Sequence, residues 1–282
     1  MRRATGVEDL RRIVARWRRA GERVAFVPTM GAIHQGHLSL VTRARASADR
    51  VVASIFVNPL QFGPGEDFKR YPRPARADRA AFAAAGVDLL WEPAIEDVYP
   101  PGDRTRVRVE QLTAGLEGAS RPGHFEGVTT VVLRLLLAVQ PDHLWLGQKD
   151  AQQARVIEQM CRDLHVPVRV RRGATVREAD GLALSSRNRY LSPGQREQAV
   201  ALWRGLRAAR ARLDAGERSA RRVADTVRRA WHGMPDVRED YVAVVDAETL
   251  EPVRTVRGRV LVAVAARVGP ARLIDNFEWE PR

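Results

Sequence analysis

Residues 24–37 of the chain read VAFVPTMGAIHQGH, and this stretch predicts the class of fold. Four consecutive apolar residues, 24–27, predict a strand that is buried on both faces. Two glycines and two histidines follow, and a helical pattern begins at residue 37. A turn that joins a buried strand directly to a helix is typical of α/β proteins, so this stretch predicts the first unit of a parallel sheet.

The same alternation continues up to residue 170. Further buried strands are predicted at 51–57, 87–91, 143–146 and 166–170, and helices at 37–48, 74–85, 127–138 and 150–164. An earlier helix is predicted from Leu10, Ile13, Val14 and Trp17, which recur at the spacing of one helical face. Strands separated by helices imply a parallel sheet covered on both sides, in which ligands bind beyond the carboxyl ends of the strands.

The pattern changes after Arg187. Ser192-Pro193-Gly194-Gln195 combines an N-cap serine, a proline at the first helical position and a glutamine at the third, and it predicts a helix that ends near Gly216. A second helix is predicted at 218–231, and strands at 241–245 and 260–265. The sequence therefore predicts an α/β domain over residues 1–174 and a smaller α+β domain over residues 175–282.

The net charge of +13 comes from 47 Lys and Arg against 34 Asp and Glu. All but two of the cations are arginine, the exceptions being Lys69 and Lys149, which indicates a coding preference for arginine. No cluster of aromatic and basic residues supports a nucleic-acid partner. The single cysteine excludes a disulfide scaffold and a zinc site built on several thiolates. The longest apolar stretch, 131–139, is much shorter than the ~20 residues that span a bilayer, so no membrane segment is expected.

The histidines of the opening stretch lie where a helix begins. Unpaired backbone N–H groups and the helix dipole favour an anion there, and Gly31 and Gly36 let a large ligand approach the backbone. His34 and His37 would then donate hydrogen bonds to phosphate oxygens. A helix cap and a surface metal pair are the alternatives, although no third ligand stands nearby at metal-binding spacing.

A polar segment, Asn58-Pro59-Leu60-Gln61-Phe62, follows the second buried strand. Gln61 offers both a donor and an acceptor and suits a neutral substrate with hydroxyl groups, whereas a simple chain reversal at Asn-Pro is the alternative. Residues 63–70, which we term the lid segment, begin with two glycines and end with charges. This segment is either a lid that excludes water or an ordinary loop.

Two further polar segments complete the candidate set. Gly147-Gln148-Lys149-Asp150 follows the strand at 143–146, and its lysine stands out in a chain that uses arginine almost everywhere. Asp150 is expected to cap the next helix. The segment 180–188, DGLALSSRN, places two hydroxyls beside a guanidinium, a combination that suits phosphate oxygens. His124, in the segment RPGHF, is a further candidate.

Taken together, these segments resemble the pantothenate synthetases, or pantoate–β-alanine ligases. The matching stretches are PTMGAIHQGH (28–37), FVNPLQF (56–62), RPGHF (121–125), GQKDAQQ (147–153), DGLALSSRN (180–188) and RLIDN (272–276). They occur in the family's order along the whole chain. The histidine element alone indicates only the wider superfamily of nucleotide-activating enzymes, which includes the class I aminoacyl-tRNA synthetases.

The resemblance implies a Rossmann-like N-terminal domain, a C-terminal domain that closes over ATP, and a cytoplasmic homodimer. In that family ATP with Mg²⁺ activates (R)-pantoate as pantoyl adenylate, with release of pyrophosphate. β-Alanine then attacks the adenylate to give pantothenate and AMP.

The resemblance also assigns residues. By position, the ATP-binding residues would be Met30, Gly31, Ala32, Ile33, His34, Gln35, Gly36, His37, Gly147, Gln148, Lys149, Asp150, Val176, Leu184, Ser185, Ser186 and Arg187. His37 would be the proton donor, with His34 and Lys149 as further catalytic residues. Gln61 and Gln153 would hold pantoate, with Gln61 also near β-alanine. No residue is assigned as a protein ligand of a metal.

Two alternatives stay open at this point. A nucleotidyltransferase that moves AMP onto a phosphate acceptor would use the same phosphate-binding groups. A tRNA synthetase would also need a domain that reads the anticodon, for which the roughly 100 residues after position 175 leave little room.

Overall fold

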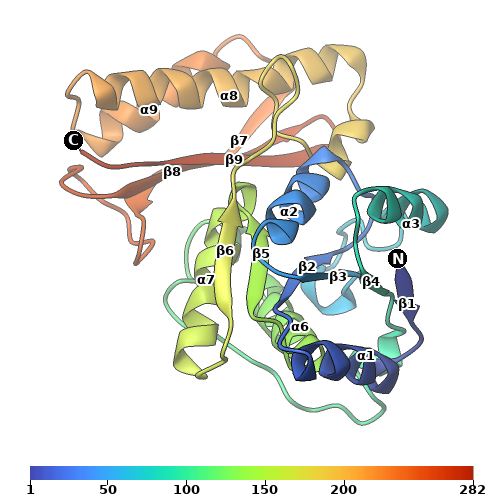
Figure 1. The fold of residues 1–282 in the computed structure, drawn as a ribbon. Coiled ribbons are helices and arrows are strands. Elements are labelled where there is room, and N and C mark those ends of the chain that lie inside the picture. The colour runs from blue at the N-terminus through green and yellow to red at the C-terminus, as the bar shows by residue number, and fades with distance from the viewer. Residues whose placement is uncertain (282) are drawn as a thin grey trace.

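The computed structural model describes residues 1–281 and contains two sheets with helices packed around them (Figure 1). Arg282, the last residue of the predicted second domain, lies outside the described residues. The elements are β1 (Arg2–Ala4), α1 (Val7–Arg19), β2 (Val24–Thr29), α2 (Gln35–Arg45), β3 (Arg50–Ile55), η1 (Pro59–Gln61), α3 (Ala75–Ala84), β4 (Leu89–Trp91), α4 (Ile95–Val98), α5 (Glu117–Ser120), α6 (His124–Val139), β5 (His143–Gly147), η2 (Gln148–Asp150), α7 (Ala151–Asp163), β6 (Arg169–Gly173), η3 (Ser186–Tyr190), α8 (Pro193–Asp214), α9 (Ala220–Trp231), β7 (Val237–Asp246), β8 (Val260–Val268) and β9 (Ala271–Trp279), where η marks a 3-10 helix.

The first sheet has six strands in the order β1-β4-β3-β2-β5-β6, and all its neighbouring strands are parallel. This confirms the predicted α/β class. From β2 the chain first builds the sheet outward through β3 and β4, and it later continues on the other side of β2 through β5 and β6. A switch point therefore lies between β2 and β5, where ligands bind in sheets of this kind.

Helices cover both faces of this sheet. On one side α1, α6 and α7 bury their apolar residues against it, and α1 does so through the four predicted positions Leu10, Ile13, Val14 and Trp17. On the other side α2 and α3 contribute Leu40, Val41, Ala44 and Phe82. Because both faces are covered, the strands read as continuous apolar runs, which is the pattern that predicted them.

The second sheet is antiparallel, in the order β7-β8-β9, and it packs against α8 and α9. The predicted capping box at the start of α8 is confirmed, since the Ser192 hydroxyl accepts the Gln195 N–H and the Gln195 side chain accepts the Ser192 N–H. Figure 1 shows this sheet lying across the end of the parallel sheet, with α8 and α9 on its far side. The α+β character of this part is confirmed.

Two strands were absent from the sequence prediction. The arginine-rich β1 pairs with β4 at the sheet edge, where few apolar residues are needed. The third strand of the second sheet, β9, alternates buried and partly exposed residues over much of its length, and this period of two could have identified it. No helix among residues 1–281 has the length and apolarity needed to cross a membrane.

Several predicted boundaries were wrong by a few residues. The strand expected at 166–170 is found at 169–173, because Val166 and Val168 close a turn around Pro167, which has no N–H to offer a ladder. The helix expected at 127–138 begins at His124, and the one expected at 37–48 begins at Gln35 and ends at Arg45.

Candidate active site

Two adjoining cavities lie beyond the carboxyl ends of β2 and β5, between the two sheets. The smaller has a volume of about 230 Å³ and the larger about 740 Å³. They share the side chains of Lys149, Asp150, Gln153, Ser185 and Arg187. Residues from both parts of the chain therefore meet in one cleft.

The two histidines of the opening stretch stand at the start of α2. His34 is the N-cap residue, and its Nδ1 accepts the Gly36 N–H at 3.1 Å. The Nδ1 atom of His37 in turn accepts the backbone N–H of His34 at 3.4 Å. The two rings stack with their centroids 4.0 Å apart. The helix-cap interpretation is thus correct for the backbone, and it leaves both Nε2 atoms free for a ligand.

Both imidazoles are neutral at physiological pH. Burial, followed by the charge of Lys149, lowers the pKa of His34 to about 4. Burial, followed by His34 and Lys149, lowers the pKa of His37 to about 3. Because each Nδ1 accepts a backbone N–H, the ring proton of each neutral histidine is on Nε2. The pair can therefore donate two hydrogen bonds through Nε2 without carrying a charge.

The loop before these histidines is held by a residue that the sequence did not reveal. Gly31 and Ala32 adopt positive φ angles of 87° and 50°. The carboxylate of Asp78, on α3, accepts the N–H groups of Ala32 at 2.9 Å and of Ile33 at 2.8 Å. A Cβ atom at Gly31 would lie 3.0 Å from the same carboxylate, so glycine is required here. These backbone N–H groups shape the loop and do not face the cleft.

Gln61 is fixed from several sides. Its side chain accepts from Asn58 Nδ2 at 3.2 Å, and its Nε2 donates to the Met30 sulfur at 2.8 Å. Asn58 is itself buried and also donates to the Gly127 carbonyl at 3.0 Å. A Cβ atom at Gly127 would meet the Leu60 carbonyl oxygen at 2.3 Å, so the approach of η1 to α6 depends on this glycine. The Asn-Pro segment thus reverses the chain and also positions Gln61.

The segment after β5 contributes Lys149 and Asp150. Asp150 stands at the N-cap position of α7, but its side chain makes no capping hydrogen bond, so the predicted cap was wrong. Its carboxylate instead lies 3.3 Å from Lys149 Nζ. Gln148 points the other way and donates to Asn276 and Glu278 on β9. This segment therefore presents one cation to the cleft and ties the cleft to the second sheet.

The serine-arginine segment closes the cleft from the other side. Ser185 caps η3 by accepting the Arg187 N–H. The Arg187 guanidinium binds Asp67 of the lid segment through Nε at 3.1 Å and Nη2 at 2.9 Å. Tyr71, just after the lid segment, has its hydroxyl 3.4 Å from the Ser186 hydroxyl. Segments more than 100 residues apart thus meet above the cleft.

A second ion pair holds the lid segment to Arg121, which lies just before α6. Arg121 binds the Glu66 carboxylate at 2.7 Å through both Nε and Nη2. His124 and Arg121 also reach the Gln61 carbonyl oxygen, at 2.9 Å and 3.2 Å. Burial lowers the pKa of His124 to about 4, so this neutral ring donates through Nδ1 and accepts from Arg121 through Nε2. His124 therefore lines the larger cavity and also holds the backbone of Gln61.

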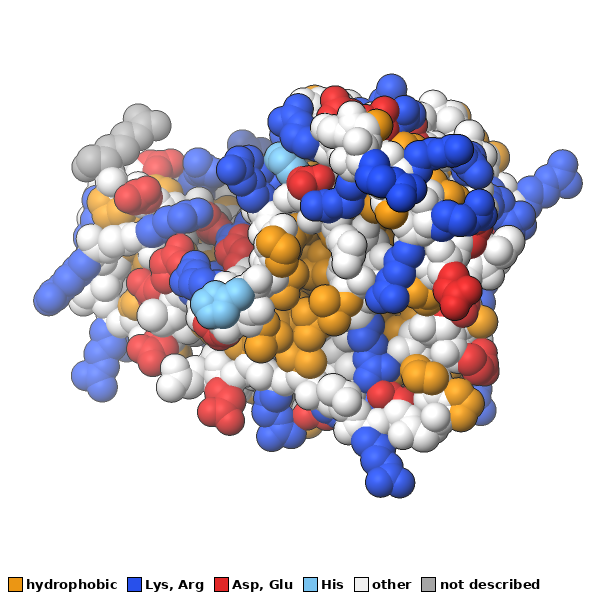
Figure 2. All heavy atoms as spheres, turned by 60° about the horizontal axis from the view of Figure 1, so that its bottom comes forward, with side chains coloured by type: hydrophobic (Ala, Val, Ile, Leu, Met, Phe, Trp, Pro, Cys, Tyr) orange, Lys and Arg blue, Asp and Glu red, His pale blue; other side chains and the backbone are white. Residues whose placement is uncertain are grey.

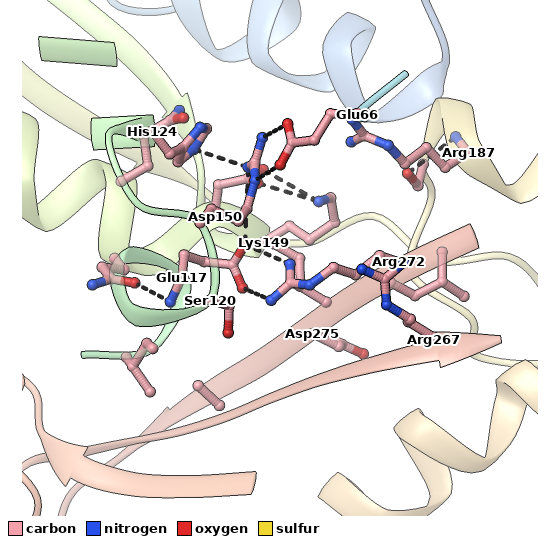
Figure 3. A pocket seen from close by; sticks show the side chains of 18 of the residues that line it. Glu66, Glu117, Ser120, His124, Lys149, Asp150, Arg187, Arg267, Arg272 and Asp275 are labelled. Atoms are coloured by element: carbon pink, nitrogen blue, oxygen red, sulfur yellow. Dashed lines mark hydrogen bonds and ion pairs between the residues drawn. The ribbon is translucent and has the colours of Figure 1, made fainter. Parts of the chain in front are cut away.

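The larger cavity is bounded by a further charge cluster. Glu117 of α5 accepts two hydrogen bonds from Arg272 of β9, at 2.6 Å and 2.8 Å, and one from the Tyr241 hydroxyl at 2.9 Å. Figure 3 shows Glu117 and Arg272 pointing toward one another, with Lys149 and Arg187 also lining this cavity. This cluster joins the second sheet to α5.

Most of the site residues predicted from the sequence line one of the two cavities, and five of them line neither. Those that line the smaller cavity are Met30, His34, Gly36, His37, Gln61, Gly147, Lys149, Asp150, Gln153, Val176, Leu184, Ser185, Ser186 and Arg187. Those that line neither cavity are Gly31, Ala32, Ile33, Gln35 and Gln148. No group of three His, Cys, Asp or Glu side chains suited to a metal ion is found within residues 1–281.

Comparisons with known proteins identify the family of the chain. The family model described as pantoate-beta-alanine ligase matches residues 2–278. The pantothenate synthetase of Moorella thermoacetica is 54% identical over 274 residues, which cover 97% of each protein.

Solved structures of such enzymes match the whole fold. The pantothenate synthetase of Thermus thermophilus superposes with a TM-score of 0.95 at 51% identity and covers 100% of both chains. The pantoate-beta-alanine ligase of Francisella tularensis, solved with beta-gamma ATP and beta-alanine, has a TM-score of 0.81 at 33% identity and covers 98% of this chain and 97% of its own. The chain therefore belongs to the pantoate–β-alanine ligase family.

Proposed function

We propose that the two adjoining cavities form the active site in which this ligase makes pantothenate in two steps. As a member of its family, the chain condenses (R)-pantoate with β-alanine and converts ATP to AMP and pyrophosphate. In the first step the pantoate carboxylate attacks the α-phosphorus of ATP, a P–O bond forms, and the bond to pyrophosphate breaks. In the second step the amine of β-alanine attacks the acyl carbon of the adenylate, and AMP leaves as the amide forms.

One observation carries the assignment of the site. His34, His37 and Lys149 reach the same small cavity as the segment Ser185–Arg187, and Gln61 and Gln153 line that cavity as well. Attack on the α-phosphorus gathers negative charge on the phosphate oxygens, so catalysis consists mainly of positioning and electrostatic stabilisation. Donor and cationic groups that are fixed before the substrate arrives supply both the positioning and the electrostatic stabilisation.

The histidines act in this proposal as neutral donors. His34 and His37 each present an Nε2–H toward the phosphates, and Lys149 adds the positive charge. His37, the proton donor implied by the family, then stabilises the transition state through a hydrogen bond. The fixed Nδ1 contacts support this role, because they prevent the rings from turning.

ATP would be held along three segments of the chain. These are residues 30–37, residues 147–150 and residues 184–187, together with Val176. Gly31, Ala32 and Ile33 contribute through the shape of their loop, which Asp78 holds.

Pantoate would be held by Gln61 and Gln153, whose amides suit its hydroxyl groups. The wall beside them is apolar and includes Phe56, Val131 and Val132, which suits the two methyl groups of pantoate. β-Alanine would bind near Gln61, and the complex of the Francisella tularensis enzyme with beta-alanine supports a site for it in this fold.

Mg²⁺ is the cation that we propose for the reaction. Asp150 lines both cavities, and its side chain is 43% exposed. Magnesium in proteins is commonly held by one or two carboxylates together with substrate phosphates, and Asp150 fits that role. The ion would neutralise charge on the phosphates.

We further propose that residues 1–174 bind ATP and pantoate, that residues 175–282 close over the nucleotide, and that the enzyme is a cytoplasmic homodimer. Figure 2 shows hydrophobic side chains gathered near the centre of the face that it presents. Exposed apolar surface of this kind supports association of two copies. Analytical ultracentrifugation of the enzyme tests the dimer directly.

Formation of AMP tests the proposed function. The complete mixture of enzyme, ATP, Mg²⁺, pantoate and β-alanine should yield AMP and pantothenate in equal amounts. Omission of ATP, pantoate or Mg²⁺ should abolish product. Turnover with a phosphorylated acceptor in place of pantoate would contradict the proposal and favour a nucleotidyltransferase.

A further inference from the structure

The lid segment, residues 63–70, lines the larger cavity and is held there by an aromatic cluster and two ion pairs. Phe62, immediately before it, packs against Phe68 and Tyr71 with ring centroids 5.4 Å and 6.0 Å apart. Glu66 and Asp67, which are adjacent in the chain, then bind two different arginines. Glu66 binds Arg121 of the first domain, whereas Asp67 binds Arg187 of the serine-arginine segment.

The pair between Asp67 and Arg187 has a geometry that fixes the guanidinium. Asp67 Oδ2 accepts from Nε at 3.1 Å and Oδ1 accepts from Nη2 at 2.9 Å, so one edge of the planar group is held in two places. The side chains are only 14% and 28% exposed. Within residues 1–281 no hydrogen bond uses Nη1 of Arg187, so this part of the fork remains available to a ligand in the cleft.

We propose that Asp67 is a positioning residue for Arg187, and that their ion pair both aims the guanidinium at the triphosphate and holds the lid segment closed. This inference rests on the proposed function, because it takes Arg187 as a phosphate-binding residue. Asp67 touches no substrate itself.

A carboxylate beside a phosphate-binding arginine could act in the opposite sense, as a competitor that ATP must displace. Two observations favour positioning. The carboxylate occupies only one edge of the fork and leaves Nη1 free. The lid segment is also held through Glu66 and the aromatic cluster, and these contacts keep Asp67 beside Arg187. An arginine that is held in place loses less conformational entropy when it binds phosphate.

The two ion pairs of the lid segment reach the proposed sites of different substrates. Glu66 reaches Arg121, which donates to the Gln61 carbonyl on the proposed pantoate side. Asp67 reaches Arg187 on the proposed nucleotide side. Loss of the Asp67 carboxylate should therefore affect ATP more than pantoate.

The test compares Asp67→Asn with the unaltered enzyme in pantoate-dependent exchange of pyrophosphate into ATP. Asp67→Asn should raise KM for ATP on the order of tenfold, the effect of losing roughly 1.4 kcal/mol, and should change KM for pantoate by less than about twofold. Asp103→Asn is the matched control, because Asp103 pairs with Arg134, is 12% exposed and lines neither cavity. The control should leave both KM values unchanged.

A second pair of variants asks whether Asp67 acts through Arg187. In an Arg187→Lys background, which keeps the charge but not the fork, addition of Asp67→Asn should have no further effect on KM for ATP. If Asp67→Asn does not fold, Asp67→Ser removes the same carboxylate and carries the same expectations.

Three results would overturn the inference: an unchanged or lower KM for ATP in Asp67→Asn, an equal rise in both KM values, or the full rise in the Arg187→Lys background. Absence of exchange in the unaltered enzyme would instead contradict the proposed function, so the two failures are distinguishable.

Discussion

The rings of His34 and His37 stack at 4.0 Å, and each accepts a backbone N–H through Nδ1, which orients both Nε2–H groups for donation. In this motif the two side chains that cap the helix are also the two that we propose as hydrogen-bond donors to the phosphates. Any substitution that removes the cap therefore also removes a donor, and stability and activity are coupled at the start of α2.

The first prediction concerns pH. Since the pKa values of His34 and His37 are lowered to about 4 and about 3, both rings stay neutral from about pH 5.5 upward. The rate of pantoate-dependent pyrophosphate exchange should therefore show no histidine ionisation between about pH 5.5 and 8. A rate that declines with a pKa near 6.5 as the pH rises would mean that a protonated histidine is required.

The second prediction concerns the catalytic groups. His37→Ala and Lys149→Ala should each lower kcat on the order of 10²- to 10³-fold, because each removes a fixed donor from the developing phosphate charge. Circular dichroism should show a folded protein in both cases. His232→Ala, at an exposed histidine after α9, serves as the control and should leave kcat unchanged. Near-normal rates for the first two variants would remove these residues from the mechanism.

The third prediction concerns Asp78, which is buried and accepts two N–H groups of the loop before His34. Asp78→Asn should lower the free energy of unfolding by roughly 1–3 kcal/mol, because the amide cannot accept both hydrogen bonds. It should also raise KM for ATP, since the loop shifts.

Asp142→Asn separates these two effects of Asp78→Asn. Asp142 also accepts a backbone N–H, that of Val24 at 2.8 Å, but at the amino end of β2 and away from the cleft. We expect Asp142→Asn to reduce stability and leave KM for ATP unchanged. If Asp78→Asn behaves in the same way, Asp78 has only a structural role.

The fourth prediction concerns the contact between α5 and the second sheet. Glu117→Ala leaves Arg272 and Tyr241 without their shared partner and should lower the free energy of unfolding by about 3 kcal/mol. Addition of Arg272→Ala should then cost less than Arg272→Ala costs alone, because the contact with Glu117 is already lost and only the ion pair with Asp240 remains to be broken. Denaturant titration of the single and double variants measures the coupling, and strictly additive losses would show that the pair is not coupled.

The sequence predicts those parts of the fold and the site whose signals come from residues close together in the chain. The strand-to-helix turn at residues 24–37 and the segment after β5 are local signals, and the switch point then brings them together. The parts that it did not predict depend on distant contacts. Asp78 holds a loop 45 residues away in the chain, and Asp67 meets Arg187 at a separation of 120 residues. Nothing in the local sequence of either aspartate distinguishes it from a surface charge, and the same holds for the arginines of the edge strand β1.

The central claim is that the cleft activates pantoate as an adenylate before β-alanine takes part. Exchange of labelled pyrophosphate into ATP, measured with enzyme and Mg²⁺, tests it most directly. The account predicts exchange that requires pantoate and proceeds without β-alanine. Exchange that appears only when β-alanine is added, or no exchange with pantoate present, would contradict it.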